Sequence, residues 1–113
     1  MIEILHNPRC GKSREGKAIL DELGKEYEIV NYLKEPISES KLEEILKKLK
    51  CSAQAIIRTK EPLWITQYKD KNLSEKQLIQ ILLENPILIE RPIVITDSKA
   101  IVGRPPVLIK TLF

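Results

Sequence analysis

The chain has 113 residues, of which 42% are hydrophobic and 31% are charged, a balance typical of a soluble globular domain. Its net charge is only +3, with lysines and arginines scattered along the sequence, which disfavours nucleic-acid binding. No apolar run reaches the roughly 18 residues of a membrane span, no signal-peptide pattern opens the chain, and two cysteines give no disulfide framework. We therefore expect one cytoplasmic domain over residues 1–113, monomeric, without a membrane or nucleic-acid partner.

The first third of the chain has the pattern of a strand, a helix and a second strand. Residues 2–5 are a short run of branched side chains, and residues 27–32 are rich in strand formers. Between them, residues 12–23 place apolar side chains at helical spacing, and Gly24 follows as a stop signal. Two strands joined by a helix predict a right-handed βαβ unit with parallel strands.

The middle of the chain, at about residues 36–84, has the pattern of a helical insertion. Ser40 and Glu43 fit a capping box at the start of a first helix. Residues 51–57 predict a second, short helix, whereas residues 62–71 have an irregular pattern. Ser74 and Gln77 fit another capping box, which predicts a third helix after them.

The last part of the chain returns to strand patterns. Residues 87–89 and 93–95 are short apolar runs, and residues 100–102 can pair with the second run across a turn at 96–99. Two prolines precede residues 107–112, which predict a terminal helix. The order βαβ, helical insertion, ββα predicts an α/β fold with a mixed sheet.

Cys10 lies in the predicted turn between the first strand and the first helix. Free N–H groups and the positive end of the helix dipole lower a thiol pKa at such a position, so a reactive thiolate competes with a buried structural thiol as its interpretation. Gly11 is expected to let backbone approach the sulfur closely. Ser13 stands where a dithiol enzyme carries its second cysteine, and its hydroxyl can donate to the sulfur. His6 can stabilise the thiolate as an imidazolium or relay a proton, although either residue can also be purely structural.

Three arginines, Arg58, Arg91 and Arg104, stand beside apolar segments. A buried guanidinium without a partner is costly, so each of them needs an anionic partner. An external tetrahedral oxyanion fits the guanidinium fork, and acids distant in the sequence are the alternative.

Four segments carry a family resemblance: residues 5–14 with Asn-Pro-Arg-Cys, residues 56–58 with Ile-Ile-Arg, residues 84–94 with Asn-Pro-Ile-Leu-Ile-Glu-Arg-Pro, and residues 103–105 with Gly-Arg-Pro. Together they closely resemble the glutaredoxin-linked arsenate reductases, the ArsC family, over essentially the whole chain. The resemblance implies a thioredoxin- or glutaredoxin-like fold with a helical insertion. It also implies a cis peptide bond before Pro92, facing the reactive cysteine.

The resemblance further implies roles for the candidate residues. Cys10 becomes the nucleophile, Arg58, Arg91 and Arg104 bind arsenate, and His6 helps to activate the thiol. Glutathione then adds to the arsenic adduct and glutaredoxin resolves it. Because these external thiols supply the remaining reducing equivalents, Ser13 can replace a resolving cysteine, and no bound cofactor or metal is expected.

Several alternatives stay open at this point. Glu90 can pair with an arginine and weaken oxyanion binding, or point to solvent. Cys51 can be a resolving thiol or a packing residue. A transcriptional regulator of the Spx type shares the implied fold but usually carries Cys-x-x-Cys, which Ser13 interrupts. Another thiol oxidoreductase is possible too, and an iron–sulfur carrier of the monothiol glutaredoxin type would need a glycine pair that is absent.

Overall fold

A four-stranded mixed sheet organises the fold. The computed structural model describes residues 1–113, and its strands lie in the order β2-β1-β3-β4. β1 (Ile2–Leu5) pairs in parallel with β2 (Tyr27–Val30) and antiparallel with β3 (Ile93–Ile95). β3 in turn pairs antiparallel with β4 (Ala100–Val102). The predicted mixed α/β sheet, with its parallel βαβ unit and its hairpin, is confirmed.

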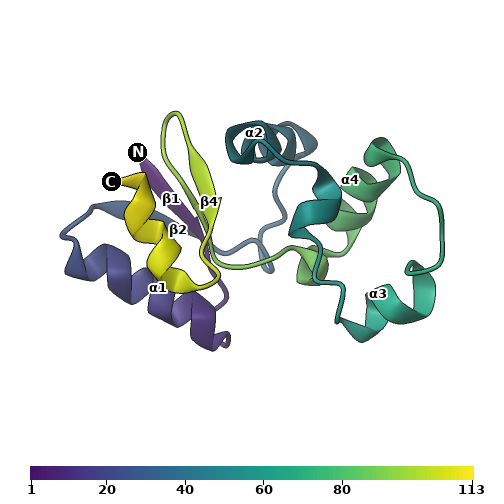
Figure 1. Cartoon of the computed structure of the whole chain (residues 1–113), viewed down its shortest axis with the longest axis horizontal. Helices are drawn as coiled ribbons and strands as arrows, with labels where there is room; N and C mark the ends of the chain where they lie inside the picture. The colour runs from purple at the N-terminus through teal and green to yellow at the C-terminus, as the bar shows by residue number, and fades with distance from the viewer.

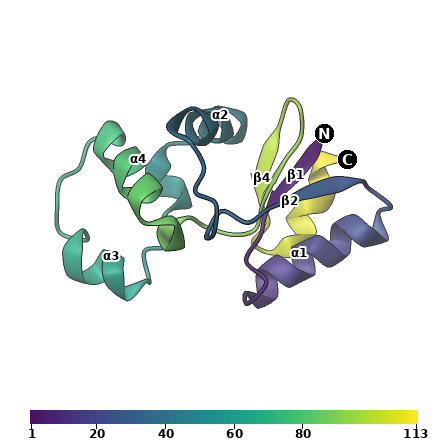
Figure 2. The ribbon, with the colours of Figure 1, turned by 180° about the vertical axis from the view of Figure 1, so that it is seen from behind.

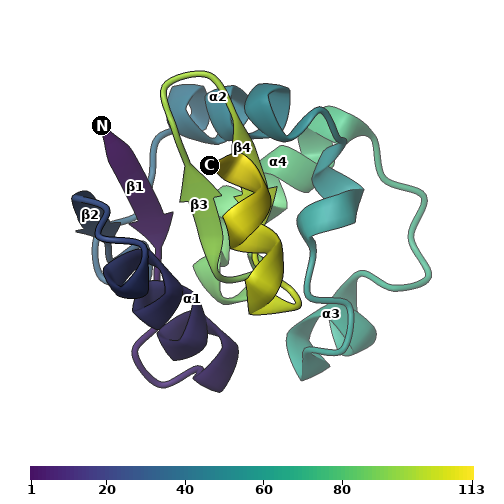
Figure 3. The ribbon, with the colours of Figure 1, turned by 60° about the vertical axis from the view of Figure 1, so that its left-hand side comes forward.

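Helices α1 (Gly11–Glu22) and η3 (Pro106–Leu112), the second a 3₁₀ helix, pack together over one face of the sheet (Figures 1 and 3). Successive side chains of a strand point to opposite faces, so Ile4 faces these helices while Leu5 faces away from them. The buried cluster on the helix side consists of four residues, Ile4, Leu20, Val94 and Ile109. A larger core of 16 buried residues, including Leu5 and Ile93, lies on the other side.

Between β2 and β3 the chain forms the helical segment that supplies most of this larger core (Figure 2). Its elements are α2 (Glu39–Leu49), η1 (Ala53–Ile56), α3 (Pro62–Gln67), α4 (Glu75–Glu84) and η2 (Pro86–Leu88). α2 packs against β4 and α4, whereas α3 lies at the end of the molecule away from the sheet, and the whole measures 43 × 26 × 24 Å. No helix combines the length and the apolar character that crossing a membrane requires.

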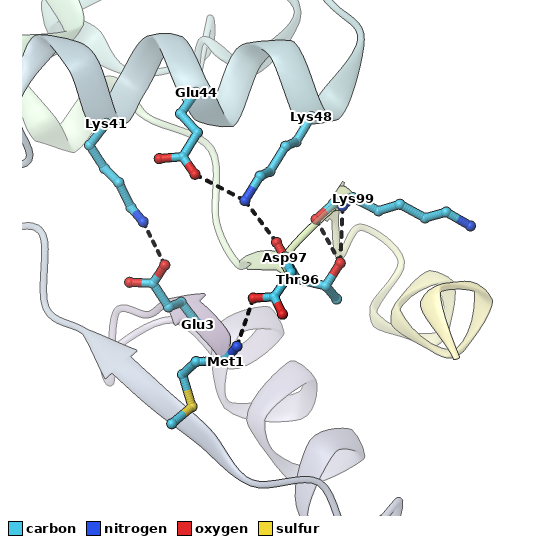
Figure 4. A network of polar contacts seen from close by, with 8 residues as sticks. All are labelled: Met1, Glu3, Lys41, Glu44, Lys48, Thr96, Asp97 and Lys99. Carbon is cyan, nitrogen blue, oxygen red and sulfur yellow. Dashed lines mark hydrogen bonds and ion pairs between the residues drawn. The ribbon is translucent and has the colours of Figure 1, made fainter.

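Polar contacts tie α2 to the sheet (Figure 4). Lys41 Nζ lies 2.5 Å from Glu3 Oε1 on β1. Lys48 Nζ donates to the carbonyl oxygen of Thr96 at 2.9 Å, at the end of β3. These two lysines lie on one face of α2, so the helix is held over the larger core at two points.

The sequence patterns located one helix start in this segment and misplaced another. The capping box of Ser74 and Gln77 is present at the start of α4 and confirms that prediction. The box predicted for Ser40 and Glu43 is wrong, because Ser38 caps α2 instead. Its hydroxyl accepts the Lys41 N–H at 3.1 Å, and Ser40 already lies inside the first helical turn.

Prolines account for the other differences. Residues 62–67 are not irregular as predicted, since Pro62 opens α3, where its fixed φ suits a first helical turn, whereas residues 68–71 lie outside any helix or strand. The strand predicted over residues 87–89 is also wrong, because Pro86 opens a 3₁₀ helix that extends to Leu88. Two other helices predicted from the sequence, over residues 51–57 and 107–112, are confirmed as the 3₁₀ helices η1 and η3.

Candidate active site

Cys10 is the residue that caps the amino terminus of α1, with an extended backbone (φ −94°, ψ 123°). The turn that leads to it is closed by Asn7, whose carbonyl oxygen accepts the Cys10 N–H at 3.0 Å and whose side-chain Oδ1 accepts the Arg9 N–H at 3.0 Å. Asparagine stabilises such turns through its short polar side chain. The half-buried sulfur therefore sits in a fixed place, at the positive end of the helix dipole.

The surroundings of Cys10 favour its thiolate. Burial of the sulfur opposes ionisation, but the backbone N–H of Ser13 and the guanidinium of Arg91 outweigh it, so the pKa of Cys10 lies below its ordinary value. The Lys12 N–H acts in the same direction. Of the three candidate arginines, only Arg91 contributes to this shift of the Cys10 pKa.

His6 and Ser13 form a buried pair beside this turn. His6 Nδ1 lies 2.6 Å from Ser13 Oγ, which also accepts the Asn7 N–H at 2.9 Å. The Ser13 hydroxyl is thus occupied at the junction of β1 and α1, and the expected hydroxyl-to-sulfur bond is not formed. Burial, followed by the charge of Lys17, lowers the pKa of His6 and favours its neutral form over the imidazolium.

Arg91 reaches the site from the segment that enters β3. The Arg91–Pro92 peptide bond is cis, as the family resemblance implies, and the Arg104–Pro105 bond is cis as well. The Arg91 side chain is only 9% exposed, and its Nε and Nη1 atoms have no partner in the chain. These buried donors are available to an anion next to the sulfur of Cys10.

Close packing of glycine against Pro92 sets the position of α1. A Cβ atom on Gly16 would lie 2.8 Å from Pro92 Cγ and 2.9 Å from Ile109 Cδ1, nearer than packed atoms allow. At Gly11 a Cβ would meet nothing nearer than Arg14 Nη2, at 3.8 Å. A side chain thus has space at Gly11, whereas Gly16 is the glycine at which the helix rests on the cis proline.

The other two arginines, Arg58 and Arg104, both contact Glu90. One carboxylate oxygen, Oε1, lies 2.9 Å from Arg58 Nη1, 3.5 Å from Arg104 Nε and 3.2 Å from the backbone nitrogen of Arg91. Of the two orientations that the sequence allowed for Glu90, the structure has the one turned toward the arginines. A cavity of about 250 Å³ lies at this cluster, lined by Ile57, Arg58, Thr59, Lys60, Glu90 and Arg104.

Local backbone pairing explains why Arg58 and Glu90 meet. Ile57 and Ile89 form an isolated antiparallel bridge, in which the Arg58 N–H donates to Leu88 and the Glu90 N–H donates to Ile56, each at 2.8 Å. Arg58 and Glu90 each follow a bridge partner, so their side chains project from the same face of the pair as diagonal neighbours, within reach of each other for long side chains. Glu90 is thus the acidic partner distant in sequence that was the alternative for Arg58, and Glu61 Oε1, three residues along the chain, adds a second carboxylate 3.2 Å from Arg58 Nε.

The structure therefore divides the predicted residues into two groups. The first group lies at the start of α1 and consists of Cys10, His6, Ser13 and Arg91. The second group consists of Arg58 and Arg104, which both contact Glu90. The two groups meet where Arg104 Nη1 donates to the Arg91 carbonyl oxygen at 3.1 Å. Cys51 packs against the larger core after α2, and its burial raises its pKa, with Glu75 acting in the same direction.

Sequence reasoning missed Tyr32, whose ring is fully buried and whose hydroxyl has no partner in the chain. Burial raises the pKa of Tyr32 to about 12, although Arg91 acts to lower it. Tyr32 ends the run predicted as a strand over residues 27–32, although β2 stops at Val30, and it carries no motif of its own. Only the register of β1 with its neighbours reveals that Tyr32 belongs to the surroundings of Cys10.

Comparisons with known proteins agree with one another. The family model described as "ArsC family" matches residues 5–112. The Escherichia coli K12 protein YfgD is 47% identical to this chain, and the match covers 93% of this chain and 90% of YfgD. A Neisseria meningitidis protein named arsenate reductase is 42% identical, and the match covers 92% of this chain and 91% of that protein. The solved structure of an arsenate reductase from Vibrio cholerae superposes with a TM-score of 0.93 at 35% identity, covering 99% of this chain and 97% of that one.

Proposed function

The chain belongs to the ArsC family, and on that premise we propose that it is an arsenate reductase whose nucleophile is Cys10. One observation carries the proposal above all others. A thiol with a lowered pKa stands at a helix amino terminus beside a buried guanidinium that has two unpartnered donor atoms. A nucleophile and an oxyanion site therefore share one place.

The reaction that we propose begins with binding of arsenate to the free donors of Arg91. The Cys10 thiolate attacks arsenic, a sulfur–arsenic bond forms, and one arsenic–oxygen bond breaks as that oxygen leaves as water after taking up protons. Arsenic is still As(V) in this adduct. The positive charge of Arg91 stabilises the negative charge on the arsenic oxygens during the attack.

Reduction then needs thiols from outside the chain. We propose that glutathione adds to the adduct and that glutaredoxin accepts the resulting mixed species. Addition of glutathione breaks a second arsenic–oxygen bond, and that oxygen leaves as water. A glutaredoxin thiolate then attacks the glutathione sulfur, so a glutathione–glutaredoxin disulfide forms and the electron pair of the broken sulfur–arsenic bond stays on arsenic, which becomes As(III). Water hydrolyses the remaining bond between Cys10 and arsenic, which releases arsenite and restores the Cys10 thiol. Ser13, with its hydroxyl held by His6 and Asn7, offers no resolving thiol, which supports an external reductant.

We also propose that the remaining residues act in this scheme. Arg58 and Arg104 bind the oxyanion after the Glu90 carboxylate has moved away from them. Neutral His6 relays a proton through its contact with Ser13. The protein works as a monomer in the reducing cytoplasm, where glutathione is available. A regulator of the Spx type is not favoured, because a dithiol switch needs a cysteine at position 13.

The test is a coupled assay with arsenate, glutathione and glutaredoxin. Wild-type protein is expected to turn over, and Cys10→Ser is expected to lose all turnover because it has no nucleophile. Cys51→Ser is the matched control, since Cys51 packs at the end of α2, and its turnover should equal that of the wild type. Absence of turnover by folded wild-type protein contradicts the proposal.

A further inference from the structure

Three buried polar side-chain atoms in the protein make no hydrogen bond of standard length and angle within the chain: the hydroxyl oxygen of Tyr32 and the Nε and Nη1 atoms of Arg91. Tyr32 is fully buried and Arg91 is 9% exposed. Burying a polar group without a hydrogen bond costs about 1–3 kcal/mol, so proteins seldom leave such groups unpaired. Finding all of them in two residues points to a ligand that they share.

The sheet register brings these residues to one place. Leu5, at the end of β1, pairs with Val30 on one side and Ile93 on the other. Tyr32 follows Val30 and Arg91 precedes Ile93, so the two side chains start on either side of the segment that leads from β1 to Cys10. Arg91 acts on the pKa of Tyr32 through its charge and through a side-chain contact that falls outside standard hydrogen-bond geometry, so the guanidinium and the hydroxyl lie close together. The charges of Arg58 and Cys10 act on the same hydroxyl, which agrees with this placement.

The chemistry of these atoms defines what they can bind. A guanidinium can only donate hydrogen bonds, and the hydroxyl of a neutral tyrosine has one proton to donate. Burial raises the pKa of Tyr32 to about 12, so the hydroxyl keeps that proton at physiological pH. The nearest carboxylate, Glu90, is turned toward Arg58 and Arg104. These donors therefore have no acceptor within the chain, and an anion with several oxygen atoms would provide one for each of them.

We propose that Tyr32 is a substrate-binding residue, whose hydroxyl donates a hydrogen bond to an oxygen of the oxyanion that Arg91 holds against the sulfur of Cys10. This inference rests on the proposed function, because it requires an oxyanion at Cys10. Two N–H groups of Arg91 and one O–H group of Tyr32 then contact the anion from different directions. Such contacts fix a tetrahedral anion in orientation as well as in position.

The hydroxyl is not explained by the stability of the fold. The Tyr32 ring packs in the larger core, and phenylalanine would fill the same space without burying an unpaired oxygen. Tyr32→Phe is therefore expected to unfold at the same temperature as the wild type or a higher one. A lower unfolding temperature would reveal a structural partner for the hydroxyl and would overturn the inference.

Binding is tested by the protection of Cys10 from alkylation by iodoacetamide, in a Cys51→Ser background so that only Cys10 reacts. The quantity compared is the arsenate concentration that halves the alkylation rate. Loss of a hydrogen bond to a charged ligand predicts an increase of about tenfold or more in Tyr32→Phe. Tyr27→Phe removes the same group at the start of β2, where the hydroxyl donates to the exposed Asp21, and should leave the value unchanged.

A second measurement needs no variant at position 32. With an isotope label on the Cζ carbon of the three tyrosines, arsenate should shift one carbon resonance, which Tyr27→Phe and Tyr68→Phe assign to Tyr32 by elimination. If Tyr32→Phe and the wild type need the same arsenate concentration for half protection, and arsenate does not shift the Tyr32 resonance, the hydroxyl does not bind the anion and contacts at most a water molecule. That result overturns the inference and leaves the proposed function standing, whereas no protection of the wild type overturns both.

Discussion

At the scale of single residues, Glu90 occupies the position that an external oxyanion would need at Arg58 and Arg104. A single carboxylate oxygen contacts both guanidinium groups and one backbone N–H. An arriving anion must therefore displace or approach a like charge, which costs binding energy. Glu90 does not compete with an anion for the Arg91 side chain, because the Nε and Nη1 atoms of Arg91 have no hydrogen-bond partner and its guanidinium acts on Cys10.

Glu90→Gln is expected to strengthen arsenate binding. The amide keeps the size of the side chain and removes its charge, so Arg58 and Arg104 become available, and the arsenate concentration for half protection of Cys10 should fall roughly tenfold. Glu61→Gln is the control, since Glu61 contacts Arg58 alone and should change the value less. Weaker binding by Glu90→Gln would mean that the carboxylate positions the arginines rather than competing with the anion.

The ionisation of Cys10 gives a prediction in pH. Because the pKa of Cys10 lies below its ordinary value, its alkylation rate should reach half of its maximum at a lower pH than that of an unperturbed cysteine in a short peptide. Arg91→Gln removes the positive charge that favours the thiolate, so this midpoint should move to higher pH. The measurement is the alkylation rate against pH in a Cys51→Ser background. A midpoint that does not change in Arg91→Gln contradicts the assigned contact.

At the scale of elements, the site depends on how closely α1 approaches the segment around Pro92. Gly16 is the point of contact, with Pro92 and Ile109 on the opposing side. Cys10 begins this same helix and Arg91 directly precedes Pro92, so the spacing between α1 and the proline also sets the spacing between sulfur and guanidinium.

Gly16→Ala is expected to destabilise the fold by about 1–3 kcal/mol, because the new methyl group cannot fit without moving packed neighbours. It should also raise the pKa of Cys10, since α1 moves away from Arg91. Denaturant unfolding and the pH dependence of alkylation measure the two effects. Gly11→Ala is the control for stability: its methyl group has space, so alanine should be neutral or slightly stabilising there. Equal stability of both variants would contradict the packing argument.

Sequence patterns correctly predicted the elements that are marked by two agreeing local signals. The strand pair of residues 93–95 and 100–102, and the capping box of Ser74 with Gln77, each combine two agreeing local signals. The run at residues 87–89 is wrongly predicted as a strand, because periodicity alone cannot distinguish a short apolar strand from a short buried helical segment. Ser38 and Ser40 are both good cap residues, and packing of the α2 apolar face, not local chemistry, chooses between them.

At the scale of the whole molecule, the candidate site needs contacts that no local pattern contains. The motifs around Cys10 and Arg91 could be recognised as such, but the pairing of Glu90 with Arg58 depends on the bridge between Ile57 and Ile89. The burial of Tyr32 beside Arg91 likewise depends on β1 lying between β2 and β3. Sequence reasoning therefore found the charged groups and missed which of them are already paired.

The central place of β1 also has a consequence for synthesis of the protein. Cys10 leaves the ribosome before Arg91 and β3 do, and β1 pairs with β3 only after the intervening chain has been made. Long-range strand pairing of this kind forms late in folding, because a long loop must close first. Until then Cys10 lacks the guanidinium that favours its thiolate. The nascent chain thus carries a cysteine of more ordinary reactivity, and the reactive thiolate arises only with the completed fold.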